Sequence, residues 1–166
     1  NDFVCDVNDD RIPTIKKKYR FNLLGGTPAH RKTAFASLAN LPTEYLNYVF
    51  KRHKLPITLK NVGGSTRGAT TSSNSGNGWY PTRMWIGQVT GKFNPLPHEM
   101  GHAMEHYNKY SFPNFQKDLT VMYKWAMNNS ESSVMRGYAK SNQTEFWAEV
   151  FDSYYCSQES RDYMKE

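Results

Sequence analysis

The sequence lacks several features that would place it in a familiar class at once. Its 166 residues contain no apolar run near the roughly 20 residues needed to cross a bilayer, so no membrane span is expected. It has only two cysteines, Cys5 and Cys156, and neither has the C-x-x-C spacing of a cysteine zinc site. The Gly-Lys-Ser/Thr ending of a phosphate-binding loop is also missing. These absences leave one ordinary globular domain over residues 1–166.

Positive charge is in excess, with a net charge of +6 and a basic cluster at residues 16–20. We interpret the cluster as a solvated face or as a surface for anionic cell-surface material. No nucleic-acid partner is expected, because no nucleic-acid-binding motif is present.

The ends of the chain bear on the compartment. The sequence starts at Asn1 without a signal peptide, so we expect a processed, secreted product. In an oxidising compartment Cys5 and Cys156 could form a disulfide, and two buried free thiols are the alternative.

The feature around which the chain is organised is H-E-x-x-H at residues 98–102. At helical spacing His98 and His102 lie one turn apart on one face, so both imidazoles can reach one zinc ion. Glu99 is then placed to accept a proton from a zinc-activated water. His106 cannot join both histidines, because it lies about 12 Å along the helix from His98. A pair of His102 with His106 would put Ala103 where the base should be.

The third protein ligand must come from further along the chain, and the residues after the motif do not continue the metzincin pattern. Glu131 and Glu145 are the candidates. Glu131 sits in a Ser- and Asn-rich linker, where capping is the ordinary role, and Glu145 could itself form a capping box with Asn142. We favour Glu145 as the ligand, because Glu149 lies one turn later and could orient a ligating imidazole.

The remaining segments predict mixed α and β structure. We expect a strand at 18–24, a helical hairpin after Thr27, a short strand at 55–62, a strand at 83–89, and helices at 112–128 and from residue 142 onward. The Gly- and Ser-rich stretch 63–78 is predicted to be a surface loop, with a flap over the cleft as the sharper alternative. If the strand at 83–89 lies at a sheet edge, Trp85, Ile86 and Gly87 could bind an extended peptide by strand addition.

Two segments carry a family resemblance. The run from His98 to Ala103 and the run from Tyr138 to Phe151 together resemble the catalytic domain of anthrax lethal factor and the related secreted Pro-Pro endopeptidases. The resemblance implies zinc ligands at His98, His102 and Glu145, a general base at Glu99, and a tyrosine that assists catalysis at Tyr138.

These observations predict an α+β, zincin-like metallopeptidase domain with a small mixed sheet and an active-site helix that carries H-E-x-x-H. We expect a secreted, monomeric zinc endopeptidase that cuts a peptide or protein substrate, and the resemblance implies extended, proline-containing peptides. The alternative is a zinc-containing binding module or adhesin that has lost turnover.

Overall fold

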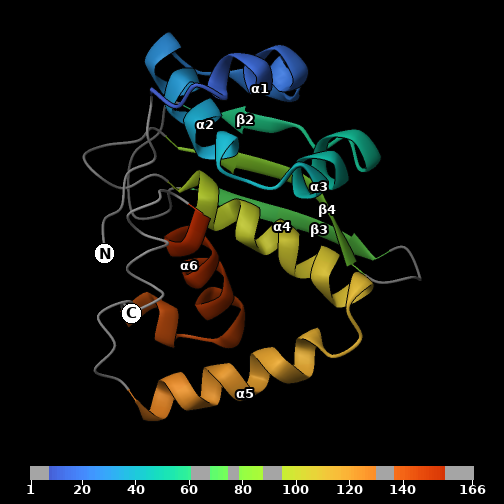
Figure 1. Cartoon of the computed structure of the whole chain (residues 1–166), viewed down its shortest axis with the longest axis vertical. Helices are drawn as coiled ribbons and strands as arrows, with labels where there is room; N and C mark the ends of the chain where they lie inside the picture. Colours follow the sequence, from blue (N-terminus) through green and yellow to red (C-terminus); the bar gives the residue numbers. More distant parts are fainter. Residues whose placement is uncertain (1–7, 61–67, 75–78, 88–94, 130–136, 156–166) are drawn as a thin grey trace.

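The computed structural model describes residues 8–60, 68–74, 79–87, 95–129 and 137–155 (Figure 1). Four strands form one sheet in the order β1-β2-β4-β3, with β1 at Leu23–Gly25, β2 at Ile57–Leu59, β3 at Gly68–Asn74 and β4 at Trp79–Ile86. The pairs β1/β2 and β2/β4 are parallel, and β3/β4 is antiparallel. The predicted α+β class with a small mixed sheet is confirmed.

The strand predicted at 83–89 does form, as β4, but it does not lie at the edge. Trp85 pairs with Thr58 of β2 on one side and with Ala69 of β3 on the other. The prediction that a peptide binds to this strand by strand addition is therefore wrong, because the backbone N–H and C=O groups of β4 already pair with β2 and β3. The terminal strand on this side is β3.

Part of the predicted Gly- and Ser-rich loop is this terminal strand. Residues 68–74 pair with β4 from Gly68 opposite Ile86 to Asn74 opposite Trp79, with a shift of register between Thr71 and Ser72. The rest of the predicted loop, at 63–67 and 75–78, lies outside the described residues, and so does the flap alternative.

The strand predicted at 18–24 is mostly helical. Helix α1 spans Ile12–Tyr19 and continues as a 3₁₀ turn, η1, at Arg20–Asn22 before β1 begins. The reason is that apolar residues from Ile12 onward have helical spacing, which the alternating pattern within 18–24 concealed. Ile12, Ile15 and Tyr19 follow i, i+3, i+7 spacing and pack together against the hydrophobic core.

The predicted helical hairpin is present. Helix α2, Pro28–Ala39, begins as expected, with the Thr27 hydroxyl oxygen accepting a hydrogen bond from the His30 backbone N–H at 3.1 Å. After Pro42, α3 at Thr43–Leu46 runs on as a π-helical segment, η2, at Asn47–Arg52. The apolar stripes of the hairpin enter the core as predicted.

Helix α4, Leu96–Ser111, runs alongside β3 and β4 and packs closely against α6, Gln143–Tyr155 (Figure 1). The close approach depends on Gly101, where a Cβ would lie only 3.0 Å from Ala148 Cα and 3.1 Å from Phe151 Cβ. The Trp147 indole N–H also donates to the Gly101 carbonyl oxygen at 2.8 Å. This contact fixes the rotation of α6, and with it the direction of the carboxylates of α6.

Helix α5, Phe115–Asn128, forms as predicted. Its Met122 and Trp125 side chains are 53% and 63% exposed. The side that packs against α6 is instead lined by Phe115, Leu119, Tyr123 and Ala126. This set follows the i, i+4, i+8 and i+11 spacing of one helical face.

Candidate metal centre

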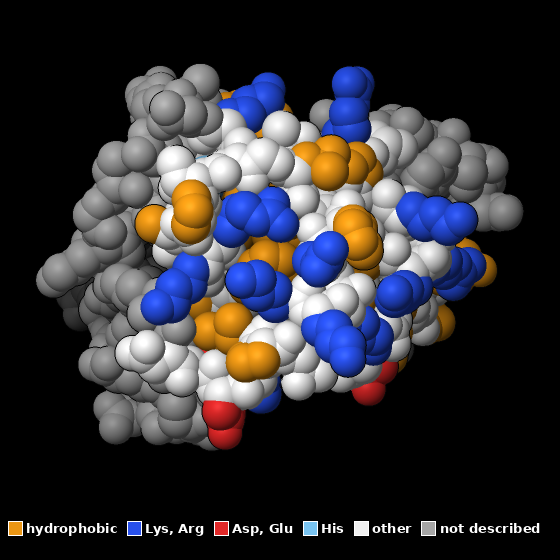
Figure 2. Space-filling view, turned by 90° about the horizontal axis from the view of Figure 1, so that it is seen from above, with side chains coloured by type: hydrophobic (Ala, Val, Ile, Leu, Met, Phe, Trp, Pro, Cys, Tyr) orange, Lys and Arg blue, Asp and Glu red, His pale blue; other side chains and the backbone are white. Residues whose placement is uncertain are grey.

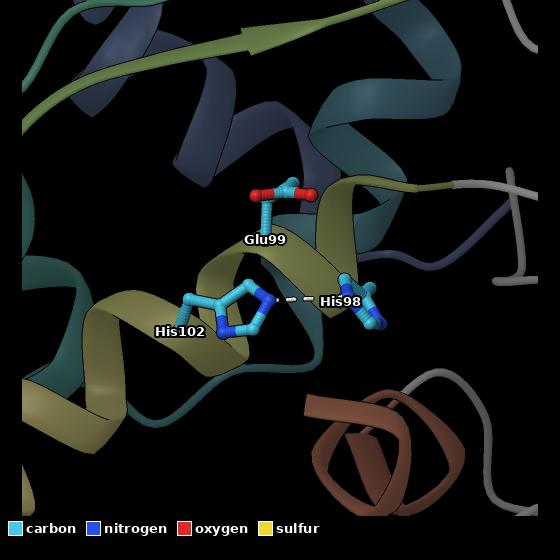
Figure 3. Close-up of side chains that lie close together, drawn as sticks. All are labelled: His98, Glu99 and His102. Carbon is cyan, nitrogen blue, oxygen red and sulfur yellow. Dashed lines mark hydrogen bonds between the residues drawn. The ribbon is translucent and has the colours of Figure 1, made fainter. Parts of the chain in front are cut away.

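Helix α4 presents three ionisable side chains in its first two turns (Figure 3). His98 and His102 lie side by side along the helix, with their Nε2 atoms 3.2 Å apart, while Glu99 points away from the pair. His98 is 5% exposed and Glu99 is 6% exposed. One ligand atom from each of the three residues lies within 4.8 Å of the others. His106 does not belong to this group, as its distance along the helix from His98 predicts.

Glu145 reaches the same place from the first turn of α6. Its Oε2 atom lies 2.9 Å from His98 Nε2 and 3.4 Å from His102 Nε2. Tetrahedral zinc with bonds of about 2.05 Å would hold its ligand atoms about 3.3 Å apart, close to these separations. Glu145 Oε2 is also buried without a hydrogen bond in the described part of the chain. Two imidazoles and this carboxylate oxygen therefore fit a zinc ion.

Two carboxylates compete for the third position, and the contacts separate them. Glu145 lies within 3.4 Å of both Nε2 atoms, whereas the Glu99 carboxylate is directed to Thr70. One of the two hydrogen bonds of the predicted capping box is present, because the Asn142 side chain accepts a hydrogen bond from the Glu145 backbone N–H at 2.8 Å. The Glu145 carboxylate itself faces the histidines. The other candidate, Glu131, lies outside the described residues.

Glu149, one turn further along α6, contacts the opposite nitrogen of His98. Its Oε1 atom lies 3.1 Å from His98 Nδ1, and the residue is 4% exposed. A proton on Nδ1 shared with this carboxylate leaves the Nε2 lone pair directed at the Glu145 side. The structure thus places Glu149 where it can set the tautomer and orientation of a ligating imidazole.

Burial and neighbouring charges shift the pKa values of the two histidines in opposite directions. Burial lowers the pKa of His98, but the carboxylates of Glu149, Glu99 and Glu145 outweigh it and leave the pKa raised. The pKa of His102 is lowered, chiefly by burial and then by the neighbouring His98. The lowered pKa favours the neutral form of His102, which is the state that a metal ligand requires.

The sequence analysis missed Thr70, which reaches the centre from β3. Its hydroxyl donates to Glu99 Oε2 at 2.7 Å and lies 3.3 Å from the Glu99 carbonyl oxygen. Burial raises the pKa of Glu99, and the hydrogen bond from Thr70 opposes that shift. Gly68 leaves room for this carboxylate, because a Cβ there would lie 3.1 Å from Glu99 Cγ. The run of Thr in 70–71 was the signal for a strand, and it was hidden by the surrounding Gly and Ser.

The predicted substrate-binding residues differ in accessibility. Ile86 is 1% exposed and belongs to the core, and Gly87 is buried as well. Trp85 is half-buried, with the Lys60 ammonium 4.9 Å from its ring centroid. Of these three, Trp85 has side-chain surface that a ligand can reach.

Two further predictions fall beyond the described parts. The backbone of Tyr138 lies in the 3₁₀ turn η3, Gly137–Lys140, directly before α6, but its side chain is outside the described residues. Cys5 and Cys156 also lie outside them, so their pairing stays a prediction.

No helix in the described residues is long and apolar enough to cross a membrane.

Comparison with known proteins places this centre in context. Residues 85–166, which include α4 and α6, match the family model "Anthrax toxin lethal factor, N- and C-terminal domain". Over this stretch the chain is similar to the lethal factor family. The predicted resemblance is confirmed, and both motifs that suggested it lie within the matched residues.

A solved structure gives the second match. The fold is similar to that of the Pro-Pro endopeptidase PPEP-2 from Paenibacillus alvei, with a TM-score of 0.58 and 18% sequence identity. The similarity covers 86% of this chain and 88% of that one. At this identity the likeness is one of fold. Among curated proteins there is no match to the chain.

Proposed function

We propose that this protein is a zinc-dependent endopeptidase. The observation that carries the proposal is the convergence of His98 Nε2, His102 Nε2 and Glu145 Oε2 at separations of 2.9 to 3.4 Å. These three residues would hold the ion. Bound there, zinc would supply a Lewis acid that polarises a peptide carbonyl and makes water more acidic. The match of residues 85–166 to the lethal factor family model supports the same chemistry.

The surrounding residues take distinct roles in this proposal. Glu99 accepts the proton of the attacking water. Burial raises the pKa of its carboxyl group, so the carboxylate binds a proton more readily. Thr70 holds one oxygen of Glu99, so the carboxylate keeps one orientation. Glu149 orients His98. The Tyr138 phenol donates a hydrogen bond to the oxygen on which negative charge develops.

The substrate in this proposal is an extended peptide that pairs with the outer side of β3. This strand ends the sheet, and Thr70 on it contacts Glu99, so a peptide bound along β3 lies next to the base. Proline-containing peptides are the class to test first, because the solved structure of similar fold is a Pro-Pro endopeptidase. Secretion of the protein as a monomer belongs to the same proposal.

The decisive experiment compares wild type with Glu99→Gln on a library of extended peptides with and without proline. Wild type should cleave some of them, and Glu99→Gln should lose at least about 10³-fold in turnover, because only the proton acceptor is removed. Zinc content and melting temperature should be unchanged in the variant.

Two outcomes would contradict the proposal. Undiminished cleavage by Glu99→Gln would require another base. Binding of peptides by a zinc-loaded wild type that cleaves none of the library would instead identify a binding module that has lost turnover.

A further inference from the structure

The positive charge of the chain is concentrated in one part of it. Residues 8–60, which form α1 to β2, contain 11 Lys and Arg and only 3 Asp and Glu, a net charge of +8. The whole chain has a net charge of +6, so everything outside this segment sums to −2. We call residues 8–60 the N-terminal layer. Its charge is too uneven to reflect the general composition of the protein.

The cations of this layer share one face of the molecule. Figure 2, seen from above α1 and α2, shows Lys and Arg side chains spread over the whole described surface, with acidic side chains only near its lower rim. Contacts also draw separate elements together. The ammonium groups of Lys18, from α1, and Lys51, from η2, lie 5.3 and 5.5 Å from the ring centroid of Tyr19. The exposed cations of the layer other than Arg11 are Lys16, Lys17, Lys18, Arg20, Lys32, Lys51, Arg52, Lys54 and Lys60.

Two large apolar side chains project within this charged layer. Phe21 is 81% exposed and Leu24 is 48% exposed. We call these two residues the apolar tip. The segment that carries the tip is held in place, because the Arg31 guanidinium donates to three of its carbonyl oxygens, those of Arg20 and Leu23 at 3.3 and 3.0 Å and of Gly25 at 3.0 Å. The Arg20 guanidinium also lies 4.6 Å from the Phe21 ring centroid. The exposure of Phe21 is therefore built into the fold.

We propose that the N-terminal layer docks on an anionic lipid bilayer. Its cations would be attracted to acidic headgroups, and the apolar tip would enter the boundary between headgroups and acyl chains. Lipid is favoured over a polyanionic chain because a sulfated polysaccharide or nucleic acid would satisfy the cations but leave the aliphatic Leu24 in water. The centre between α4 and α6 lies on the other side of α2, so docking would leave it accessible (Figure 1). This inference does not depend on peptidase activity.

The test is cosedimentation of the purified protein with vesicles of phosphatidylcholine alone or mixed with phosphatidylglycerol. Binding should require phosphatidylglycerol and should weaken strongly between about 0.1 M and about 1 M salt, where the Debye length falls from about 10 to about 3 Å. Lys16→Gln/Lys17→Gln should lower the partition coefficient by about 10- to 30-fold, since each lysine near an acidic surface contributes roughly fivefold.

A matched control has the same change of charge elsewhere. Lys117→Gln/Lys124→Gln also removes two charges, from exposed positions on α5, and should change binding less than about twofold. Phe21→Ala should lower binding by about fivefold while keeping the salt dependence, because it removes only apolar contact. Circular dichroism and melting temperature of each variant confirm that it is folded.

Three results would overturn the proposal. If the protein binds both kinds of vesicle equally, or binds neither, anionic lipid is not its partner. A larger loss in the α5 variant than in the Lys16/Lys17 variant would move the contact to α5, whose Met122 and Trp125 are also exposed. Displacement by heparin together with unchanged binding of Phe21→Ala would identify an anionic polymer instead.

Discussion

Charge is gathered in two regions of this molecule, and the two are built differently. Between α4 and α6, five ionisable side chains are largely withdrawn from water and cluster around His98 and His102, and the other three are Glu99, Glu145 and Glu149. On the N-terminal layer, the cations are exposed and few acidic groups accompany them. A buried charge without a partner is costly, whereas an exposed one is solvated and screened.

The difference predicts how each region responds to substitution. In the cluster between α4 and α6, each side chain is held by specific partners, so a single change should have a large and local effect. On the N-terminal layer, single changes should have small effects that add together and fade with salt. The four predictions below probe the first region and its surroundings, from the largest expected effect among them to the smallest.

The largest effect is expected at Tyr138, in the turn that precedes α6. If its phenol donates to the developing oxyanion, Tyr138→Phe should lower kcat by about 10² to 10³ with KM, zinc content and melting temperature near wild type. Steady-state kinetics on the best library peptide measures this. A change in kcat below about threefold would make the tyrosine structural.

The next effect is expected at Glu149. Glu149→Gln removes the negative charge at His98 Nδ1 and should weaken zinc affinity by about 10- to 100-fold. Glu105→Gln is a matched control, because Glu105 is equally buried and on α4 but pairs with Lys109 at 3.1 Å. Competition with a zinc chelator measures both. Equal affinities in the two variants would show that contact with His98 does not matter.

A smaller effect is expected at Thr70. Thr70→Val keeps the shape of the side chain but removes the hydrogen bond to Glu99, so kcat should fall by about tenfold because the carboxylate gains freedom. Thr70→Ser should restore most of the rate. Thr58→Val, on strand β2 of the same sheet, is the control and should leave kcat unchanged. If serine does not rescue, the methyl group rather than the hydroxyl is what counts.

The smallest effect is expected at His106, towards the C-terminal end of α4. Burial, with Lys109 and His102 adding to it, lowers the pKa of His106 to about 4 from the ordinary 6.5. Between these values the native state binds fewer protons than the unfolded state, so unfolding free energy should fall as pH drops from about 6.5 to 4. Because His106 is only partly buried, we expect its share to be about 1 kcal/mol.

Urea denaturation of the metal-free protein at about pH 7 and about pH 5 isolates this contribution, since zinc affinity itself depends on pH. His106→Gln should reduce the difference between the two pH values. An identical pH dependence in wild type and variant would mean that the imidazole is solvated in both states.

The sequence predicts the cluster well because its spacing is local. H-E-x-x-H puts His98 and His102 on one helical face whatever surrounds them, and a Glu145 to Glu149 interval does the same on α6. These are short-range relations within single helices. The meeting of α4 with α6 was predicted from the need for a third zinc ligand and from the family resemblance.

What the sequence could not predict depends on pairing between distant segments. Thr70 reaches Glu99 only because β3 pairs with β4, and the Gly- and Ser-rich surroundings of Thr70 and Thr71 hide the strand. The interior position of β4 is set by β2, which lies more than 20 residues earlier. The exposure of Phe21 and Trp125 likewise follows from how whole elements pack.

Zinc content measured by elemental analysis of purified variants tests the central claim most directly. Wild type should carry about one zinc per chain, His98→Ala should lose it, and Glu145→Ala should bind it much more weakly, because each removes one of three converging ligand atoms. Glu131→Ala, the control, should keep it. Full zinc in Glu145→Ala together with its loss in Glu131→Ala would contradict the account.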